Sequence, residues 1–548
     1  MTAKTETKSD TLPVFSEEPS TADDGGTGGI RYRSMALNAT LSAIILIGFW
    51  TWPELTGSTR VIATGSVFAT SFVWFMIWLS FFSRIPTAPR RLMVSTILLT
   101  VVLVCASFRV RGYTGDLVPI LACRWSSAGL TPKELGGVGN PLRHVPIVDE
   151  PTQFDSPGFL GQHRRPVVDQ VRLFRDWSAR PPQLLWHKAI GDDAGFSSFA
   201  VVGDVGVTQQ QAGELELVVC YDLPSGDILW THSDPVRFDS TIGGVGPRAT
   251  PTIDKGRVYT MGATGILNCL DFQTGDTIWS HHVLEENNAS TLRWGIAVSP
   301  LVIDSLVIVS TGHPEGPAFA TLVAYDQHSG DVVWKAGHDA SSYSSPAVVT
   351  LLGQRQILIV NNSSISSHDP ATGTILWEEP WSSLSSNTSQ PVPLSAGRLL
   401  ITKGYGNGAH LWQLAKSGDD WSVSKLWHSP RLLRTKATST VVRDGHAYGL
   451  SDGFLECVDI DASSRCWKQR GYGHGQVILV DDLLLVQVES GDVALVEATP
   501  DRFLEVARFS PLASRTWNYP VLAGSYLIVR NDREIACYIL PLDSTSPH

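Results

Sequence analysis

The stretch YDLPSGDILW, residues 221–230, decides the fold, because variants of it recur along the chain. In each variant an aspartate is followed eight residues later by a tryptophan, usually with a glycine four residues before the tryptophan. Further copies read LDFQTGDTIW (270–279), YDQHSGDVVW (325–334), HDPATGTILW (368–377) and, with Ser463 at the glycine position, VDIDASSRCW (458–467). A repeat of roughly 40 to 50 residues is typical of propellers and solenoids.

Each copy predicts a hairpin between two β-strands. The aspartate side chain can accept backbone N–H bonds and hold an Asx-type turn, and glycine supplies the positive φ of a tight turn. The tryptophan that follows is a large apolar plate that can wedge between neighbouring sheets. We therefore predict a structural role for Asp222, Trp230, Asp271, Trp279, Asp326, Trp334, Asp369, Trp377, Asp459 and Trp467.

The number of repeats predicts an all-β propeller with eight four-stranded antiparallel blades. A short polar segment, often Ser-Pro or Thr-Pro, leads into the first strand of each repeat, and the chain has about eight such lead-in segments. They lie near Phe199, Pro251, Pro300, Pro346, Pro391, Ser439, Gln476 and Pro520. The last unit lacks its tryptophan strand, whereas an isolated tryptophan strand around Trp186 precedes the first unit. Pairing the two would complete the eighth blade and close the ring.

Two repeats are degenerate, so seven blades remain an alternative. The fifth unit, around Trp412 to Trp427, and the seventh, which ends near Val506, both depart from the consensus.

Three apolar stretches precede the repeats, at about residues 35–52, 61–82 and 92–108. The second has over twenty residues without a charge, enough to cross ~30 Å of hydrocarbon, and the others are nearer the minimum of ~17 residues. The arginines set the orientation: Arg31 and Arg33 precede the first stretch, and Arg84, Arg90 and Arg91 lie between the second and third. We predict a bacterial inner-membrane protein with a cytoplasmic N-terminus and a periplasmic propeller.

The predicted organisation has five parts. They are a disordered polar tail (1–33), a membrane anchor of three transmembrane helices (34–109), a juxtamembrane segment and Pro-rich linker (110–182), the propeller (183–541) and a short tail (542–548).

Composition excludes some functions. The chain has 43% apolar and 17% charged residues and a net charge of −11, which argues against a nucleic-acid partner. Four cysteines occupy the same third-strand position of their repeats and are expected in the core: Cys220, Cys269, Cys457 and Cys537. Whether Cys457 pairs with Cys466 across a hairpin stays open.

The consensus A-x-D-x-x-T-G-x-x-x-W, with its Ser-Pro lead-in, resembles the pyrroloquinoline quinone (PQQ) repeat family over roughly residues 180–541. The resemblance implies an eight-bladed propeller. It also implies one of two functions: a quinoprotein dehydrogenase that oxidises alcohols or sugars with PQQ and calcium, or a cofactor-free scaffold similar to the BamB-type lipoprotein. The chain has no Cys-Cys pair of the kind that many quinoprotein alcohol dehydrogenases carry.

The candidate site is a ring at one mouth of the central channel, because the innermost strands of a propeller line that channel. The ring residues are Arg248, Thr250, Trp294, Tyr343, Ser345, Lys436, Tyr472, His474, Gln476, Arg515, Trp517 and Asn518. Arginine and lysine with aromatic surfaces could hold an anionic, planar or sugar-like ligand, PQQ included. The alternative is a ring whose polar groups only bond neighbouring blades.

The favoured function is a non-catalytic binding or scaffold module for envelope proteins or polymers, held in the bilayer by three helices. The alternative is a PQQ-dependent dehydrogenase that passes electrons to membrane quinone. No catalytic residue and no metal ligand can be assigned from the sequence.

Overall fold

The computed structural model describes residues 25–52, 55–83, 85–125, 151–191, 194–317, 319–381 and 385–543. Most of the predicted polar tail, the predicted linker from 126 to 150 and the last five residues lie outside the described residues. The chain divides into a helical unit, Met1–Pro53 with Ile62–Ala106, and a propeller unit, Glu54–Val61 with Ser107–His548.

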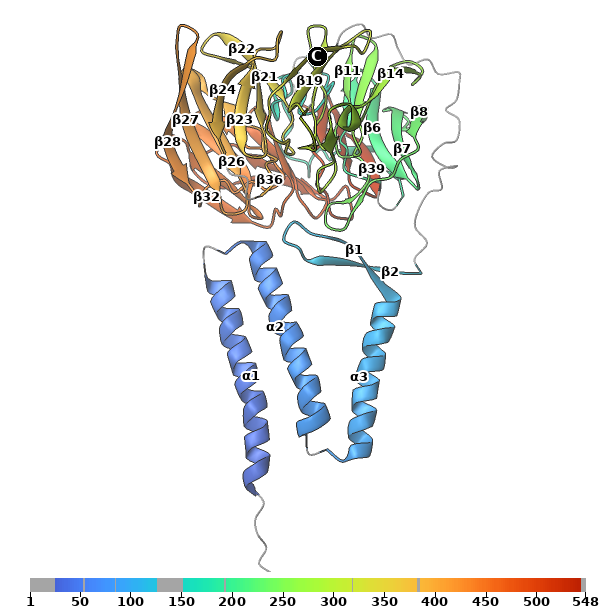
Figure 1. Ribbon diagram of the computed structural model, residues 1–548, viewed down its shortest axis with the longest axis vertical. Helices are drawn as coiled ribbons and strands as arrows, with labels where there is room; N and C mark the ends of the chain where they lie inside the picture. Colours follow the sequence, from blue (N-terminus) through green and yellow to red (C-terminus); the bar gives the residue numbers. More distant parts are fainter. Residues whose placement is uncertain are drawn as a thin grey trace, which may run out of the picture. The chain divides into compact units, whose positions relative to one another are not determined.

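The helical unit is built from long apolar helices, labelled in Figure 1. They are α1 (Gly25–Thr51), α2 (Gly57–Ile77), which continues into the π-helical turn η1 (Trp78–Phe82), and α3 (Thr87–Ser107). Two helical stretches in the described chain, Gly57–Phe82 and Thr87–Ser107, are long and apolar enough to cross a membrane. The first predicted span corresponds to the apolar part of α1, Met35–Thr51, which is shorter than the other two. Of the three predicted spans, the second and third therefore have the length and composition of a membrane span, and the first is shorter.

Blades one to four each contain four antiparallel strands, ordered from the inner to the outer edge. Blade one is β5 (Ala200–Val202), β6 (Val205–Ala212), β7 (Leu215–Asp222) and β8 (Ile228–Asp234). Blade two is β11 (Thr252–Asp254), β12 (Arg257–Met261), β13 (Ile266–Asp271) and β14 (Thr277–His282). Blade three is β16 (Leu301–Ile303), β17 (Leu306–Ser310), β19 (Leu322–Asp326) and β20 (Val332–Ala336), and blade four is β21 (Ala347–Leu351), β22 (Gln354–Val360), β23 (Ser364–His368) and β24 (Ile375–Pro380).

Blades five to eight continue the order. Blade five is β25 (Val392–Pro393), β26 (Arg398–Lys403), β27 (Gly408–Ser417) and β28 (Asp420–Ser429), and blade six is β29 (Val441–Arg443), β30 (His446–Ser451), β31 (Phe454–Asp459) and β32 (Ser464–Arg470). Blade seven is β33 (Gln476–Val480), β34 (Leu483–Gln487), β35 (Val493–Glu497) and β36 (Glu505–Phe509). Blade eight is β37 (Val521–Ala523), β38 (Tyr526–Arg530), β39 (Glu534–Ile539) and, from the start of the repeat region, β4 (Gln183–Ala189).

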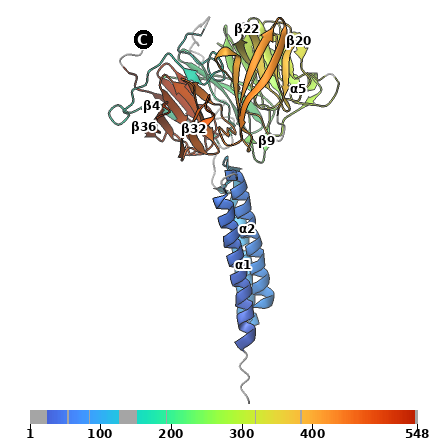
Figure 2. The same ribbon diagram turned by 90° about the vertical axis from the view of Figure 1, so that its left-hand side faces the viewer.

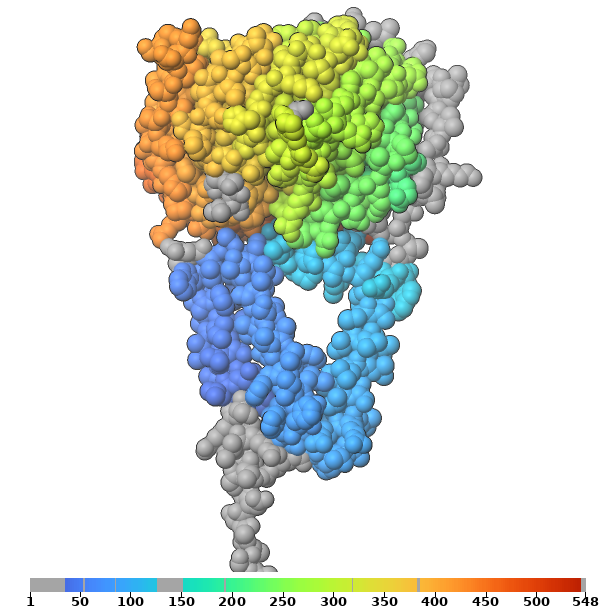
Figure 3. Space-filling model, viewed as in Figure 1, coloured from blue at the N-terminus to red at the C-terminus, as the bar shows by residue number. Residues whose placement is uncertain are grey.

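Short elements connect these strands. They are β9 (Asp239–Ser240) paired with β10 (Gly244–Val245), β15 (Ala289–Ser290) paired with β18 (His313–Pro314), the helix α5 (Val283–Glu286) and the 3₁₀ turn η2 (Ser395–Gly397). Consecutive blades lie side by side, as the colour gradient from green through yellow to orange across the surface in Figure 3 shows.

Eight blades are confirmed, and the two degenerate repeats each supply all four strands of a blade: the fifth forms a four-stranded sheet, and the seventh forms a sheet that a further short strand extends to five. The ring closes as predicted, because β4 pairs with β39 with Trp186 opposite Cys537. Figure 2 labels β4 beside the C-terminal strands.

The Asp–Trp motif has a regular geometry that joins most blades to the next. The carboxylate of Asp271 accepts the amides of Gln273 and Thr274, both at 2.9 Å, which confirms the Asx-type turn. The indole N–H of Trp230 in blade one donates to the carbonyl of Phe272, the residue after that aspartate, at 2.9 Å.

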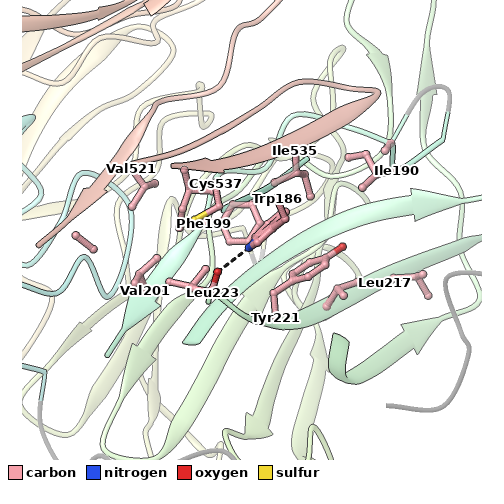
Figure 4. Close-up of a cluster of buried hydrophobic side chains, with 14 of the residues drawn as sticks. Trp186, Ile190, Phe199, Val201, Leu217, Tyr221, Leu223, Val521, Ile535 and Cys537 are labelled. Atoms are coloured by element: carbon pink, nitrogen blue, oxygen red, sulfur yellow. Dashed lines mark hydrogen bonds between the residues drawn. The ribbon is translucent and has the colours of Figure 1, made fainter. Parts of the chain in front are cut away.

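The same bond recurs around the ring. Trp186 of the closing strand donates to the Leu223 carbonyl of blade one at 2.6 Å, within the buried cluster of Figure 4.

The motif glycine is required for two separate reasons. Its φ is positive in each of the four glycine copies, between 74° and 79°, and Ser463 adopts φ 52° in the fifth. A Cβ built on Gly275 would lie 2.5 Å from the ring of Trp230, and one on Gly226 would lie 2.6 Å from the ring of Trp186. The tryptophan of one blade therefore packs directly on the glycine turn of the next.

The third-strand cysteines are buried as predicted, each with 0% of its surface exposed. Cys220, Cys269 and Cys457 lie opposite Trp230, Trp279 and Trp467 in their strand pairs. A small side chain at this position leaves room for the indole of the neighbouring strand. Cys457 and Cys466 are free thiols.

Candidate functional site

The segments that lead into the inner strands bond to one another around the channel. The amide of Thr250 donates to Ser299 Oγ at 2.9 Å, and the amide of Ser299 donates to Ser345 Oγ at 3.0 Å. Gln476 donates through Nε2 to the carbonyls of Ala437 and Trp517 at 2.8 and 2.7 Å. Side chains at these positions thus tie adjacent blades together.

Asn518 has the same role, since its Nδ2 donates to the carbonyl of Ser197 at 2.8 Å. Of the predicted ring, Thr250, Ser345, Gln476 and Asn518 are therefore committed to bonds between blades.

Three basic residues of the predicted ring contact one hairpin: Lys436, His474 and Arg515. This mouth hairpin consists of β1 (Phe108–Tyr113) and β2 (Pro119–Cys123), which pair antiparallel, and of the turn between them. Its Asp116 Oδ1 lies 3.0 Å from His474 Nε2 and 3.5 Å from Lys436 Nζ. The carbonyl of Tyr113 accepts a bond from Arg515 Nη1 at 2.5 Å.

Asp116 is the acidic residue that lies between two basic side chains of this mouth. Burial alone would raise its pKa, but its hydrogen bond to His474 and the positive charges of His474 and Lys436 outweigh burial and lower the pKa below the usual value. The carboxylate is therefore ionised at neutral pH beside two basic side chains that are almost fully buried, with 4% and 6% of their surface exposed.

The side chain of Glu489 holds the turn of the mouth hairpin by accepting a hydrogen bond from the backbone of that turn. Its Oε1 accepts the amide of Gly115 at 2.6 Å and the indole N–H of Trp517 at 2.9 Å, while Oε2 accepts the amide of His474 at 3.0 Å. A Cβ on Gly115 would lie 2.3 Å from the imidazole ring of His474. The turn can approach the mouth this closely only because residue 115 has no side chain.

Arg515 contacts both the mouth hairpin and the aromatic side chains of the propeller beside it. Its guanidinium is 4.2 Å from the ring centre of Trp517 and 5.1 Å from that of Phe196, and its Nη2 is 3.3 Å from Asp532 Oδ2. Arg111 of β1 lies 3.1 Å from the same carboxylate oxygen. Burial, opposed by the charge of Asp532 and assisted by that of Arg111, lowers the pKa of Arg515.

The other predicted residues lie apart from the mouth hairpin. Arg248 donates to the carbonyls of Gly243 and Gly244 at 2.9 and 2.7 Å, and burial lowers its pKa to about 10. Trp294 packs on Tyr343 with ring centres 5.4 Å apart, and its amide donates to the Tyr343 hydroxyl at 3.1 Å.

Tyr472 does not face the mouth. It is 1% exposed within a core cluster of blades six and seven, and its hydroxyl bonds to Glu505. The prediction of a stacking surface at Tyr472 is wrong, because its ring is buried among apolar side chains.

A second segment, residues 151–171, contacts the inner strands themselves. Ser156 forms a bridge with Val201, and β3 (Val167–Val168) adds in parallel to β33 of blade seven. Arg164 donates through Nη1 to the carbonyls of Ser299 and Pro346, each at 3.0 Å, and through Nη2 to that of Pro300. Burial lowers its pKa to about 9. The segment thus contacts blades one, three, four and seven at their inner strands or lead-in segments.

Sequence reasoning missed both segments, which it assigned to a juxtamembrane segment and linker. A signal for the mouth hairpin is present, since Gly115 and Asp116 form a turn pair between two short runs with β-forming residues. Nothing local predicts where that hairpin docks, because its partners lie more than 300 residues away.

Comparisons with known proteins identify the repeats. A family profile described as "Outer membrane protein assembly factor BamB" matches residues 214–469. The propeller is of the PQQ-repeat type. The outer membrane protein assembly factor BamB of Shewanella oneidensis is 22% identical over 360 residues, which cover 58% of this chain and 89% of that protein.

Quinoproteins are also similar to the chain. The quinohemoprotein alcohol dehydrogenase ADH-IIG of Pseudomonas putida is 24% identical over 189 residues, which cover 34% of this chain and 25% of that enzyme. A europium-containing methanol dehydrogenase structure superposes with a TM-score of 0.51 at 12% identity, covering 69% of this chain and 90% of the enzyme. At that identity the likeness concerns the fold alone.

PQQ with calcium, which the quinoprotein side of the family implies, does not fit this mouth. The cationic groups that could meet its carboxylates, on Lys436 and Arg515, already bind the mouth hairpin. Glu489, an acidic side chain in the same place, accepts three N–H bonds. Among the described residues, no three His, Cys, Asp or Glu side chains come together as a metal-binding group.

Proposed function

We propose that this chain is a membrane-anchored, periplasm-facing propeller that acts as a non-catalytic binding or scaffold module for envelope proteins or polymers. One observation carries the proposal: the chain's own mouth hairpin occupies the place where a propeller enzyme would admit a ligand. Asp116 pairs with Lys436 and His474, and the carbonyl of Tyr113 accepts a bond from Arg515 Nη1.

Anchoring is supported by the apolar helices and their flanks. The helical stretches Gly57–Phe82 and Thr87–Ser107 have the length and hydropathy of spans, and we propose the apolar part of α1 as a third. The arginine bias supports a cytoplasmic N-terminus in the inner membrane, with the propeller on the other side.

The outer strands of the blades supply the surface for a partner. Several apolar side chains on them are 42% to 51% exposed: Leu184, Ile278, Val332, Val333 and Leu426. Outer strands also have one unpaired backbone edge, to which an extended segment of another protein can add. The similarity to BamB, a factor in outer membrane protein assembly by name, supports a partner of this class.

The experiment incubates the detergent-purified chain with PQQ and Ca²⁺ and measures cofactor absorbance and dye reduction over a panel of alcohols and sugars. We expect neither binding nor turnover, for wild type and for Asp116→Asn, which loosens the mouth hairpin. Turnover by either protein would overturn the scaffold assignment in favour of the dehydrogenase.

A positive test uses a photoreactive amino acid at Val333 in living cells. We expect one recurrent envelope partner, whose crosslink is lost when Val332 is changed to Asp and kept when Asp304 is changed to Asn. Crosslinks that do not depend on Val332 would count against this surface. A C-terminal reporter active only in the periplasm tests the topology, and no reporter activity would contradict it.

A further inference from the structure

A cavity of about 590 Å³ lies between the mouth hairpin and blades seven and eight. Its walls come from β1 and β2 on one side and from the lead-in segments and turns of the two blades on the other. Arg111, Arg515 and Arg533 line it together with Ser490, Ser514 and Thr114, and Ile120, Leu121, Ala122, Val488 and Ala513 form its apolar part. This volume is within the range of small-molecule sites, roughly 300 to 1,000 Å³.

The arginines give this hairpin cavity an excess of positive charge. Arg111 and Arg515 share one oxygen of Asp532, at 3.1 and 3.3 Å, although the two side chains are only 7% and 5% exposed. Arg533 adds a third guanidinium to the wall. Among the described residues that line the cavity, Glu489 is the one carboxylate, and its oxygens accept the amide and indole bonds described above.

Arg515 also has a donor left over. Its Nε is buried and has no hydrogen-bond partner in the described part of the chain, although both terminal nitrogens are bonded. A buried donor without an acceptor is costly, and an anion in the cavity beside Arg515 would supply that acceptor. Phosphate matches arginine especially well, because its oxygens accept paired N–H bonds.

Exposed apolar side chains of the mouth hairpin indicate where such an anion comes from. Phe108 and Val110 are 43% and 51% exposed, and Leu121, which pairs with Val110 and also lines the cavity, is 58% exposed. The hairpin begins at the residue after α3, a helix with the composition of a membrane span. At about 3.3 Å per strand residue these apolar side chains lie within the headgroup layer, if α3 spans the bilayer as proposed.

Trp125, just beyond β2, is 74% exposed, and tryptophan is enriched at this level of membrane proteins. A cavity that is cationic on one side and apolar on the other, next to the headgroup layer, suits a lipid better than a free anion.

We propose that the hairpin cavity binds an acidic phospholipid, with its phosphate on Arg515 and Arg533 and the start of its acyl chains along residues 120–122. This inference rests on the membrane anchoring proposed above. Lipid binding at this place would fasten the mouth hairpin, and with it the propeller, to the anionic surface of the membrane.

The test reconstitutes the full chain in nanodiscs of equal parts phosphatidylcholine and phosphatidylglycerol, and native mass spectrometry counts the lipids that stay bound. We expect retained phosphatidylglycerol to exceed phosphatidylcholine. Arg515→Gln and, separately, Arg533→Gln should lower that preference by about tenfold, the effect of losing one charged hydrogen bond. The control Arg355→Gln removes an exposed arginine that pairs with Asp304 in blade four and should leave the preference unchanged.

Two further arms separate the alternatives. Arg533→Gln lies outside the contact between Arg515 and Tyr113, so it tests the cavity even if Arg515→Gln disturbs the fold. Inorganic phosphate is added to discs of pure phosphatidylcholine, and a rise in melting temperature without any preference for phosphatidylglycerol would overturn the lipid assignment.

Equal retention of both lipids by wild type, or a preference unchanged in both cavity variants, would also overturn it. Failure of the chain to enter neutral discs at all would instead overturn the membrane anchoring.

Discussion

Gly275→Ala tests how the blades are joined, because the structure contains a matched control in the same blade. Gly275 has φ 76° and lies under Trp230, whereas Gly256 has φ 72° and an added Cβ there would have no heavy atom of the described chain within 4 Å. Both substitutions bear the cost of a left-handed backbone, about 1–2 kcal/mol. Only the new methyl group at position 275 must also displace an indole ring 2.5 Å away.

Overpacking of this kind adds about 1–3 kcal/mol. We therefore expect Gly275→Ala to lower the free energy of unfolding by about 2–5 kcal/mol and Gly256→Ala by about 1–2 kcal/mol. The assay compares thermal and urea unfolding of the full chain in detergent, with retained circular dichroism as the check on the fold. Equal destabilisation by the two substitutions would refute the claim that the indole needs a bare glycine beneath it.

A double-mutant cycle refines the comparison. In a Trp230→Ala background the clash is gone, so Gly275→Ala should then cost no more than Gly256→Ala. The coupling energy between positions 230 and 275 is expected at about 1–3 kcal/mol. Coupling near zero would show that the cost at Gly275 comes from the backbone alone.

Three other predictions follow from charged and polar groups. Asp116 has a lowered pKa in the folded chain, so its stabilising contact is complete above the unfolded value near 4 and is lost as the pH falls through the folded value. Melting temperatures should therefore fall more steeply for wild type than for Asp116→Asn between about pH 5 and pH 3, and parallel curves would contradict this. Burial, with the nearby charges of His428 and Lys425, lowers the pKa of His410 to about 3, so the folded chain loses stability as the pH drops below the unfolded value near 6.5. His410→Gln should flatten that loss, which is at most about 2 kcal/mol at pH 5 before solvent screening, and an unchanged slope would count against it. Arg164→Lys should lower the free energy of unfolding by about 1–3 kcal/mol, because one ammonium cannot reach all three carbonyls; a neutral result in urea titration would show that water replaces the guanidinium.

The repeat made the propeller predictable. Asp271, Gly275 and Trp279 specify a turn and a wedge by local chemistry, and their recurrence fixes the blade type. Ring closure was predictable as well, because Trp186 had no other repeat to join. Blade five was harder to recognise, since both Trp412 and Trp427 occur in it and the second donates to the Ile460 carbonyl of blade six.

The candidate site was predictable only in its location. Lead-in residues such as Lys436 and His474 do meet at the mouth, as the topology requires. Their partner Asp116 was not predictable, because a hairpin outside the repeats has no periodicity that would indicate its docking place. Tyr472 was misplaced because a residue four positions before an inner strand can still point into the blade.

The pairing of β4 with β39 also sets the order of events during synthesis. The two strands are separated by roughly 350 residues, which take about 20 to 70 s to translate. The apolar helices leave the ribosome long before the last blade exists, so they can insert while Trp186 and its strand still lack a partner. A chain truncated before residue 534 could build seven blades but would never close, and its first strand would stay exposed as an aggregation-prone edge.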